Sequence, residues 1–150
     1  MEWETYRLEQ EEDSFSFMFY SEGPKGRVKK SIVFQPNQRL GQNVFNLAFG
    51  DFDEVTKRME DAVVTNNGDH LKILHTVAWS VIEFLGANPN AFILIMGSTS
   101  SRTRLYQMRI AGLLSYVTQQ FEILGELEEK WVPFESDVNY KRFLVYRKIK

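Results

Sequence analysis

Apolar and polar positions alternate over the first part of the chain. Between Ser14 and Tyr20 every second residue is a phenylalanine, a period of two that indicates a strand with one aromatic face. Residues 22–26 include two glycines and a proline and predict a turn. Apolar residues alternate again from Arg27 to Gln35, so the two segments predict a β-hairpin. A third strand is predicted from Val44 to Phe49, which favours an antiparallel meander.

The middle of the chain changes to a spacing of three and four residues. This apolar stripe predicts a helix from about Asp69 to Leu85. Residues 65–69 are polar and suited to an N-cap, whereas Gly86 and Pro89 predict the helix end, with the glycine as C-cap. Residues 63–64, both valine, are a candidate short strand.

The second half of the chain predicts one more helix and three strands. The continuous apolar run from Ala91 to Met96 is typical of a central strand buried on both faces. A helix is predicted from about Ser101 to Gln119, followed by strands from Phe121 to Leu127 and from Arg142 to Arg147. The segment around Trp131 fits neither pattern.

Together these elements predict one α+β domain over residues 1–150. The expected order is β-β-β-α-β-α-β-β, with a mostly antiparallel sheet of five or six strands and two helices packed on one face. Parallel pairing of the strand at 91–96 with a neighbour would make the sheet mixed.

Composition agrees with a packed domain. Hydrophobic residues make up 43% of the chain and aromatic residues 14%, which argues against disorder. The chain contains no cysteine, which excludes disulfides, thiolate nucleophiles and cysteine-ligated metals. The longest apolar stretch, Phe92 to Met96, is too short to cross a bilayer, and the acidic segment Met1 to Asp13 lacks the apolar run of a signal peptide. The expected location is the cytoplasm, with no membrane partner.

Charge is unevenly distributed, although the net charge is only −2. Residues 1–13 contain six acidic residues and one arginine, whereas residues 139–150 contain five basic residues and no acidic one. Residues 25–30 form another basic stretch. These segments either solvate the surface, pair within the chain, or pair between two chains.

The segment Gly97 to Arg104 carries the clearest candidate chemistry. It joins a buried strand to a helix, and α/β proteins place ligands at such junctions. The helix start offers N–H groups, the loop offers hydroxyls, and two arginines add charge, all suited to an anion. The spacing of Arg102, Tyr106 and Arg109 places them on one helix face. The candidate anion-binding residues are Ser98, Thr99, Ser101, Arg102, Arg104, Tyr106 and Arg109.

A purely structural interpretation of this segment stays open. The loop lacks the Gly-Lys-Ser/Thr element of a Walker A motif and the glycine spacing of a dinucleotide-binding loop. One serine would then cap the helix, and the arginines would pair with surface acidic residues. His70 and His75 lie five positions apart and do not share a helix face, so no metal site is predicted.

Asp51 and Asp53 follow the third strand, close to Asn46. Two neighbouring carboxylates can bind Mg²⁺ or share a proton, which with Arg102 suggests a hydrolase or nuclease. The same Gly-Asp sequence is typical of a simple turn. The sequence leaves both interpretations open.

Four short motifs stand out along the chain: NLAFGD at residues 46–51, TNNGD at 65–69, Thr-Val at 76–77, and GSTxxRTRLY at 97–106. With these motifs the chain resembles a family of small bacterial proteins that is catalogued only as a domain of unknown function. The resemblance spans about Phe15 to Lys148, and the last motif is its most specific part. It implies a compact single domain and supplies no catalytic residue, substrate or cofactor.

The leading functional hypothesis is binding of a phosphate-bearing ligand, a nucleotide or RNA, at residues 97–109. Tyr106 and Tyr146 are candidates to stack on bases, and basic strands near Lys29 and Arg147 would extend the positive surface. One alternative is a protein-interaction module, such as a toxin–antitoxin component or a homodimer. Another is the hydrolase or nuclease. No cofactor, metal or catalytic residue is predicted.

Overall fold

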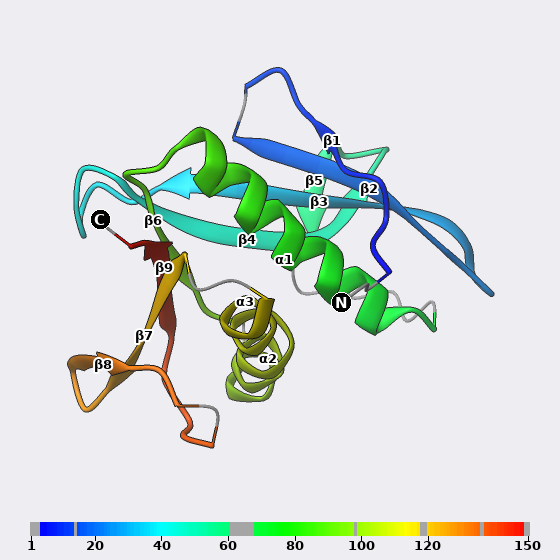
Figure 1. Cartoon of the computed structure of the whole chain (residues 1–150). Helices are drawn as coiled ribbons and strands as arrows, with labels where there is room; N and C mark the ends of the chain where they lie inside the picture. Colours follow the sequence, from blue (N-terminus) through cyan, green and yellow to red (C-terminus); the bar gives the residue numbers. More distant parts are fainter. Residues whose placement is uncertain are drawn as a thin grey trace.

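The computed structural model describes residues 4–13, 15–60, 68–97, 99–117, 120–135 and 137–148, and the candidate strand at 63–64 lies outside them. Within these ranges nine strands form one sheet, and two helical segments pack against it (Figure 1). The strands are β1 (Glu9–Gln10), β2 (Ser16–Gly23), β3 (Gly26–Pro36), β4 (Val44–Asp53), β5 (Arg58–Glu60), β6 (Phe92–Ile95), β7 (Phe121–Leu127), β8 (Lys130–Pro133) and β9 (Phe143–Arg147). The helical segments are α1 (His70–Ala87) and a second run made of α2 (Ser100–Tyr106), the π-helical turn η1 (Gln107–Ala111) and α3 (Gly112–Val117).

The sheet has the order β1-β2-β3-β4-β6-β9-β7-β8, with β5 paired to β4. Only β4 and β6 pair in parallel among the described strands, so the sheet is mixed but mostly antiparallel. The α+β class and the two helices are confirmed. The predicted strand number and element order are wrong, because β1, β5 and β8 are too short to show a period of two. Trp131, which the sequence pattern did not place, lies in the edge strand β8.

One face of the sheet forms the hydrophobic core. The strand register aligns Phe34 with Leu47 and Ile93 with Val145, and all four side chains belong to the core or pack against it. In Figure 1, α1 lies across β2, β3 and β4, and the second helical run packs against β7 and α1. The Phe84 ring of α1 stacks on Phe34, with 4.2 Å between the ring centroids. Both helical segments therefore cover the same face, as predicted.

The opposite face carries no helix in the described part of the chain. Side chains at alternate positions of β2, β3 and β4 point to this face and are half-buried rather than covered. Arg27 lies over the ring of Tyr20 at 3.8 Å from its centroid, and Lys29 lies over Phe52 at 4.3 Å. Two of the four cations of the basic stretch at residues 25–30 therefore pack on neighbouring aromatic rings.

The ends of α1 differ from the prediction. Asp69 occupies the N-cap position without a side-chain cap bond, and its carboxylate accepts the hydroxyl of Tyr6 instead. At the other end Gly86 lies within the helix, and Asn88 donates from both its N–H and its side chain to the Phe84 carbonyl. The predicted glycine C-cap at residue 86 is therefore wrong, because the helix continues to Ala87 and Asn88 is the C-cap that bonds the Phe84 carbonyl.

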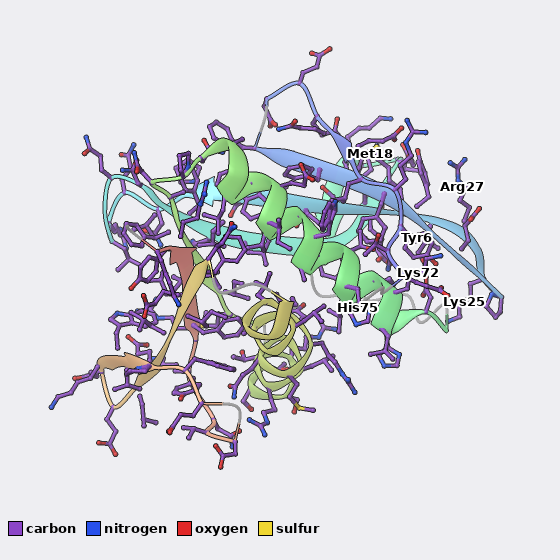
Figure 2. All side chains as sticks on the ribbon, viewed as in Figure 1. Tyr6, Met18, Lys25, Arg27, Lys72 and His75 are labelled. Atoms are coloured by element: carbon purple, nitrogen blue, oxygen red, sulfur yellow. The ribbon has the colours of Figure 1, made fainter. Side chains whose placement is uncertain are left out.

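The N-terminal segment is fastened to the start of α1. The Tyr6 N–H donates to Thr76 Oγ1 at 2.8 Å, and the Tyr6 ring stacks on Phe19 at 5.6 Å between centroids. Lys72 Nζ also lies over the Tyr6 ring, 4.2 Å from its centroid, and Figure 2 shows the two side chains next to each other. In the sheet, four strands separate the acidic edge at β1 from the basic strand β9. The two oppositely charged ends are therefore not strand neighbours within one chain.

No helix among the described residues is both long enough and apolar enough to span a membrane.

Candidate functional site

A cleft opens at the carboxyl ends of the two parallel strands. β4 and β6 pair only where Val44–Asn46 lies beside Phe92–Leu94. Beyond this point β4 continues to Asp53, whereas β6 ends at Ile95 and the chain turns into α2. The space between the diverging strands has a volume of about 240 Å³. Ligands of α/β sheets commonly bind outside the carboxyl ends of the strands, where neighbouring connections diverge.

This cleft is lined by residues from β3, β4, β6, α1, α2 and η1, from the loops after β3 and β6, and from the segment before β9. They are Gln35, Asn37, Asn46, Leu47, Ala48, Phe49, Val77, Leu94, Met96, Gly97, Arg102, Tyr106, Ile110 and Arg142. Among these described residues two are arginines, three carry side-chain amides and none is acidic. The cleft thus combines positive charge with neutral hydrogen-bonding groups and an apolar wall.

Local hydrogen bonds at the start of α2 determine where Arg102 lies. Thr99 Oγ1 accepts the Arg102 N–H at 3.1 Å and caps the helix, so the cap residue is a threonine rather than a serine. The Gly97 N–H donates to Thr103 Oγ1 at 2.9 Å. A Cβ at Gly97 would lie 2.6 Å from the Arg102 Cβ, so a side chain at this position would push the helix away from β6. Ser98, another predicted site residue, lies outside the described residues.

The other predicted anion-binding residues divide between two sides of the helix. Arg102 and Tyr106, one turn apart, line the cleft. Ser101 and Arg104 line a separate cavity of about 410 Å³, where an Arg104 N–H lies 3.4 Å from a backbone carbonyl. Arg109 is exposed and lies in the lining of neither space. Residues 97–109 therefore do not form one continuous anion cradle.

A π-helical turn follows directly after Tyr106. The Gly112 N–H donates to the Gln107 carbonyl, five residues back. The buried Gln107 side chain donates to the Val138 carbonyl and accepts the Tyr140 N–H at 3.4 Å. This arrangement holds the loop before β9 against the helix that carries Tyr106. Such turns are frequent at functional sites, but a single inserted residue leaves little trace in the sequence periodicity.

Amide side chains form the strand side of the cleft. Asn37 Nδ2 donates to Asn46 Oδ1 at 3.1 Å, and Gln35 is the cross-strand partner of Asn46. Asn37 is itself fixed, because its N–H donates to the Val44 carbonyl at 2.7 Å. In the sequence, Asn46 stands out as a neighbour of two aspartates and as the first residue of the NLAFGD motif, whereas Asn37 and Gln35 give no signal. The β3–β4 register brings them together.

Arg142 is a second cation of the cleft that sequence reasoning did not single out. Its Nε and a terminal nitrogen contact the two carboxylate oxygens of Glu126 at 3.0 and 3.2 Å. The guanidinium carbon lies 5.7 Å from the Trp131 ring centroid. This two-bond pairing orients Arg142 and offsets its charge locally. Forty residues separate Arg142 from Arg102 in the sequence, so no spacing pattern links the two.

The remaining residues of the nucleotide hypothesis lie outside the cleft lining. Tyr146 packs on Phe92, with 5.0 Å between ring centroids. Burial, followed by the charge of Glu122, raises the pKa of Tyr146 above its ordinary value. Lys29 lies over Phe52, and Arg147 pairs with Phe121 at the end of β9. These residues do not extend the positive surface of the cleft itself.

The two aspartates have structural partners. Asp51 pairs with Lys30, which is 1% exposed on the core face of β3. Asp53 Oδ1 accepts the N–H groups of Val55 at 2.8 Å and Thr56 at 3.3 Å, which is the turn arrangement. Neither lies in the lining of the cleft that contains Arg102. The lining of this cleft therefore does not combine the two aspartates with Arg102.

His70 is exposed at the first turn of α1, and His75 is half-buried. Among the described residues, no three His, Asp or Glu side chains form a group that would hold a metal ion.

Comparison with known proteins identifies a family but no function. A family model described as "Family of unknown function (DUF6934)" matches residues 2–148. The resemblance inferred from the sequence motifs, to a family of unknown function, is confirmed. No curated protein and no solved structure matches the chain.

Proposed function

The chain belongs to this family of unknown function, and we propose that it binds a small phosphate-bearing ligand in the cleft between the ends of β4 and β6. The observation that carries the proposal is the composition of the lining: two arginines and no acidic residue among the described residues. An anion entering this space meets two guanidinium groups, and the Glu126 carboxylate is bonded to one of them, that of Arg142.

Arg102 is the proposed phosphate ligand. Its guanidinium carries several N–H donors in a planar fork that matches phosphate oxygens. Arg142 is the second cation of the lining, and Glu126 pairs with it in two bonds. Tyr106 lies one turn beyond Arg102 and supplies a hydroxyl and a ring to the same wall.

The size of the cleft favours a compact ligand. Its volume of about 240 Å³ lies below the range of about 300–1,000 Å³ typical of pockets for drug-sized molecules. A single nucleotide or sugar phosphate suits this space better than a folded RNA. An RNA strand would have to insert one nucleotide and continue over the open face of the sheet.

A thermal-shift titration tests the proposal with inorganic phosphate, nucleoside monophosphates and a short single-stranded RNA. A ligand that binds only the folded state, at about 100 times its Kd, raises the Tm of a chain of this size by about 5–10 °C. Arg102→Ala should abolish the shift. Arg104→Ala and Arg109→Ala are matched controls, because these arginines come from the same helical run but lie outside the cleft.

Each outcome assigns the site. Loss of the shift in Arg102→Ala alone supports the cleft, and loss in Arg104→Ala alone moves binding to the second cavity. Absence of any shift with a well-folded protein would overturn the proposal. A response to RNA without a response to nucleotides would identify a strand-binding surface instead.

A protein-interaction module remains the second candidate, and one observation favours it. The open face of the sheet exposes apolar side chains at its margin, including Met96 at 53% and Trp131 at 38%. A second copy of the chain would cover this face, and its acidic β1 edge would meet the basic segment around β9 between chains. Light scattering at low and high salt tests this: a salt-sensitive dimer supports it, and a monomer under both conditions contradicts it.

A further inference from the structure

The cleft is in contact with both faces of the sheet at β4. Successive side chains of a strand point to opposite faces of its sheet. Leu47 and Phe49 line the cleft and pack against the hydrophobic core, so they lie on the face that the helices cover. Asn46 and Ala48 line the same cleft from the alternate positions, which belong to the open face. One end of the cleft therefore lies at the open face, and the other end lies against the core.

The core-side end of the cleft is apolar. Val77 of α1 and Ile110 of η1 line it, are 0% and 1% exposed, and belong to the core itself. Leu47, Phe49 and Tyr106 line the cleft and pack against the same core. Of these five described residues, Tyr106 alone has a polar side-chain group. Water gains few hydrogen bonds in a space with such walls, so an apolar occupant is favoured.

One helical run leads from the charged part of the cleft to this apolar end. Arg102, Tyr106 and Ile110 lie on successive turns, and all three line the cleft. Arg102 and Tyr106 are half-buried, whereas Ile110 is fully buried. With a rise of about 1.5 Å per residue, this row is on the order of 10 Å long. A group that extends from Arg102 towards Ile110 therefore leaves water and enters the apolar end.

The volume of the cleft limits the size of that group. An apolar cavity of about 150 Å³ is enough to hold a benzene ring. The cleft has a volume of about 240 Å³, which leaves room for one such ring together with a phosphate group. A larger ring system would extend out of the cleft.

We propose that the ligand is an aryl phosphate, a phosphate monoester with one ring-sized apolar group. Arg102 holds its phosphate, and its ring lies against Phe49 and Ile110. This inference rests on the proposed phosphate-binding function and names the ligand class. It disfavours a sugar phosphate, because sugar hydroxyls would lose their hydrogen bonds to water at the apolar end.

Isothermal titration calorimetry with phenyl phosphate, glucose 1-phosphate, glycerol phosphate and inorganic phosphate tests the inference. Phenyl phosphate should bind at least about tenfold more tightly than the other three compounds, since burial of one ring favours its binding alone.

Two variants locate the ring. Ile110→Thr places a hydroxyl at the apolar end and should weaken phenyl phosphate binding by about three- to tenfold, with binding of inorganic phosphate unchanged. Phe49→Ala should act in the same direction, and it guards against a folding defect in the first variant because Phe49 is only half-buried. Ile73→Thr is the matched control, since Ile73 is buried in the same core but is not in the cleft lining.

The outcomes separate this inference from the proposed function. If all four compounds bind within about twofold of one another and depend on Arg102, the aryl preference is overturned and phosphate binding stands. If phenyl phosphate is preferred but neither Ile110→Thr nor Phe49→Ala weakens it, the ring does not occupy the core-side end and the inference is wrong. If none of the four compounds binds, the proposed function fails and this inference fails with it.

Discussion

The Gly97 N–H donates a hydrogen bond to Thr103 Oγ1 at 2.9 Å, which joins the end of β6 to the first turn of α2. The Thr103 hydroxyl in turn donates to the Thr99 carbonyl at 3.1 Å, so one threonine satisfies groups on both sides of the junction. Thr103 is 4% exposed, and its position one residue after Arg102 directs that arginine to the cleft. The geometry of the proposed site therefore depends on the contact between Gly97 and Thr103.

Gly97→Ala should destabilise the protein. The new Cβ would lie 2.6 Å from both the Arg102 Cβ and the Thr103 backbone nitrogen, so the helix start must shift. Overpacking of this kind costs about 1–3 kcal/mol of unfolding free energy, measurable by urea denaturation. Gly86→Ala is the control, and its effect on stability should have the opposite sign. A Cβ added at Gly86 would meet no atom within 4 Å, and the residue lies inside α1. This substitution should stabilise the protein by about 0.5–1 kcal/mol. A neutral effect of Gly97→Ala would contradict the close approach.

The buried pair of Lys30 and Asp51 leads to a double-mutant prediction. Lys30→Met leaves the Asp51 carboxylate, 13% exposed, without its cation, which should cost about 3–5 kcal/mol. Changing both residues, Lys30→Met with Asp51→Leu, should recover most of that loss, because no buried charge then remains. Unfolding in urea measures the cycle.

An exposed ion pair provides the comparison for this cycle. Lys57 and Glu54 lie 3.7 Å apart, with side chains 72% and 58% exposed. Lys57→Met should change stability by less than about 1 kcal/mol, since water already solvates both charges. Equal effects of Lys30→Met and Lys57→Met would show that burial does not determine the cost.

Tyr6 predicts a loss of stability at alkaline pH. Burial, followed by the hydrogen bond to Asp69, raises the pKa of Tyr6 above its ordinary value of 10.0. The folded protein therefore holds this proton more tightly than the unfolded chain does. The resulting stabilisation is complete below pH 10.0 and is lost as the pH rises through the folded pKa. Urea unfolding above and below pH 10.0 measures it.

Tyr6→Phe removes the titrating group and should flatten this part of the pH profile. The variant should also be less stable at neutral pH, because Asp69 loses a donor while its Oδ1 is already buried without a partner in the described part of the chain. The pKa of Tyr146 is also raised, so Tyr146→Phe is the companion variant. If Tyr6→Phe loses stability above pH 10.0 as steeply as the natural chain, Tyr6 is not a source of the effect.

Gln107 should control the loop that precedes β9. Gln107→Leu leaves the Tyr140 N–H without its partner and the Val138 carbonyl with only the 3.4 Å contact from Arg104, at a cost of about 1–3 kcal/mol. Hydrogen exchange should accelerate in residues 137–142 before it changes in the rest of the sheet. Met108→Leu, an exposed neighbour on the same π turn, should leave exchange unchanged. Unaltered exchange in Gln107→Leu would contradict an anchoring role.

Sequence periodicity determined the elements that contain enough residues to repeat. The aromatic alternation of β2 and the apolar stripe of α1 are local patterns, because a strand or helix that buries one face needs apolar residues at a fixed spacing. The continuous apolar run of β6 is local as well. β7 was predicted with the bounds that the structure has, Phe121–Leu127. The sequence also indicated Arg102 and Tyr106 as candidate ligand-binding residues, because consecutive residues are enough to recognise a junction between a strand and a helix.

Tertiary structure alone decided the rest of the candidate site. Short edge strands such as β8 form because a longer strand offers a partner, and two to four residues carry no period of their own. Asn37 and Asn46 line the same cleft as Arg102 and Arg142 because β4 and β6 pair in parallel over three residues and then separate. Pairing direction and register depend on contacts between residues far apart in the chain, so no local spacing encodes them. Local spacing likewise does not predict that Lys30 is buried, because its partner, the Asp51 carboxylate, lies on the neighbouring strand.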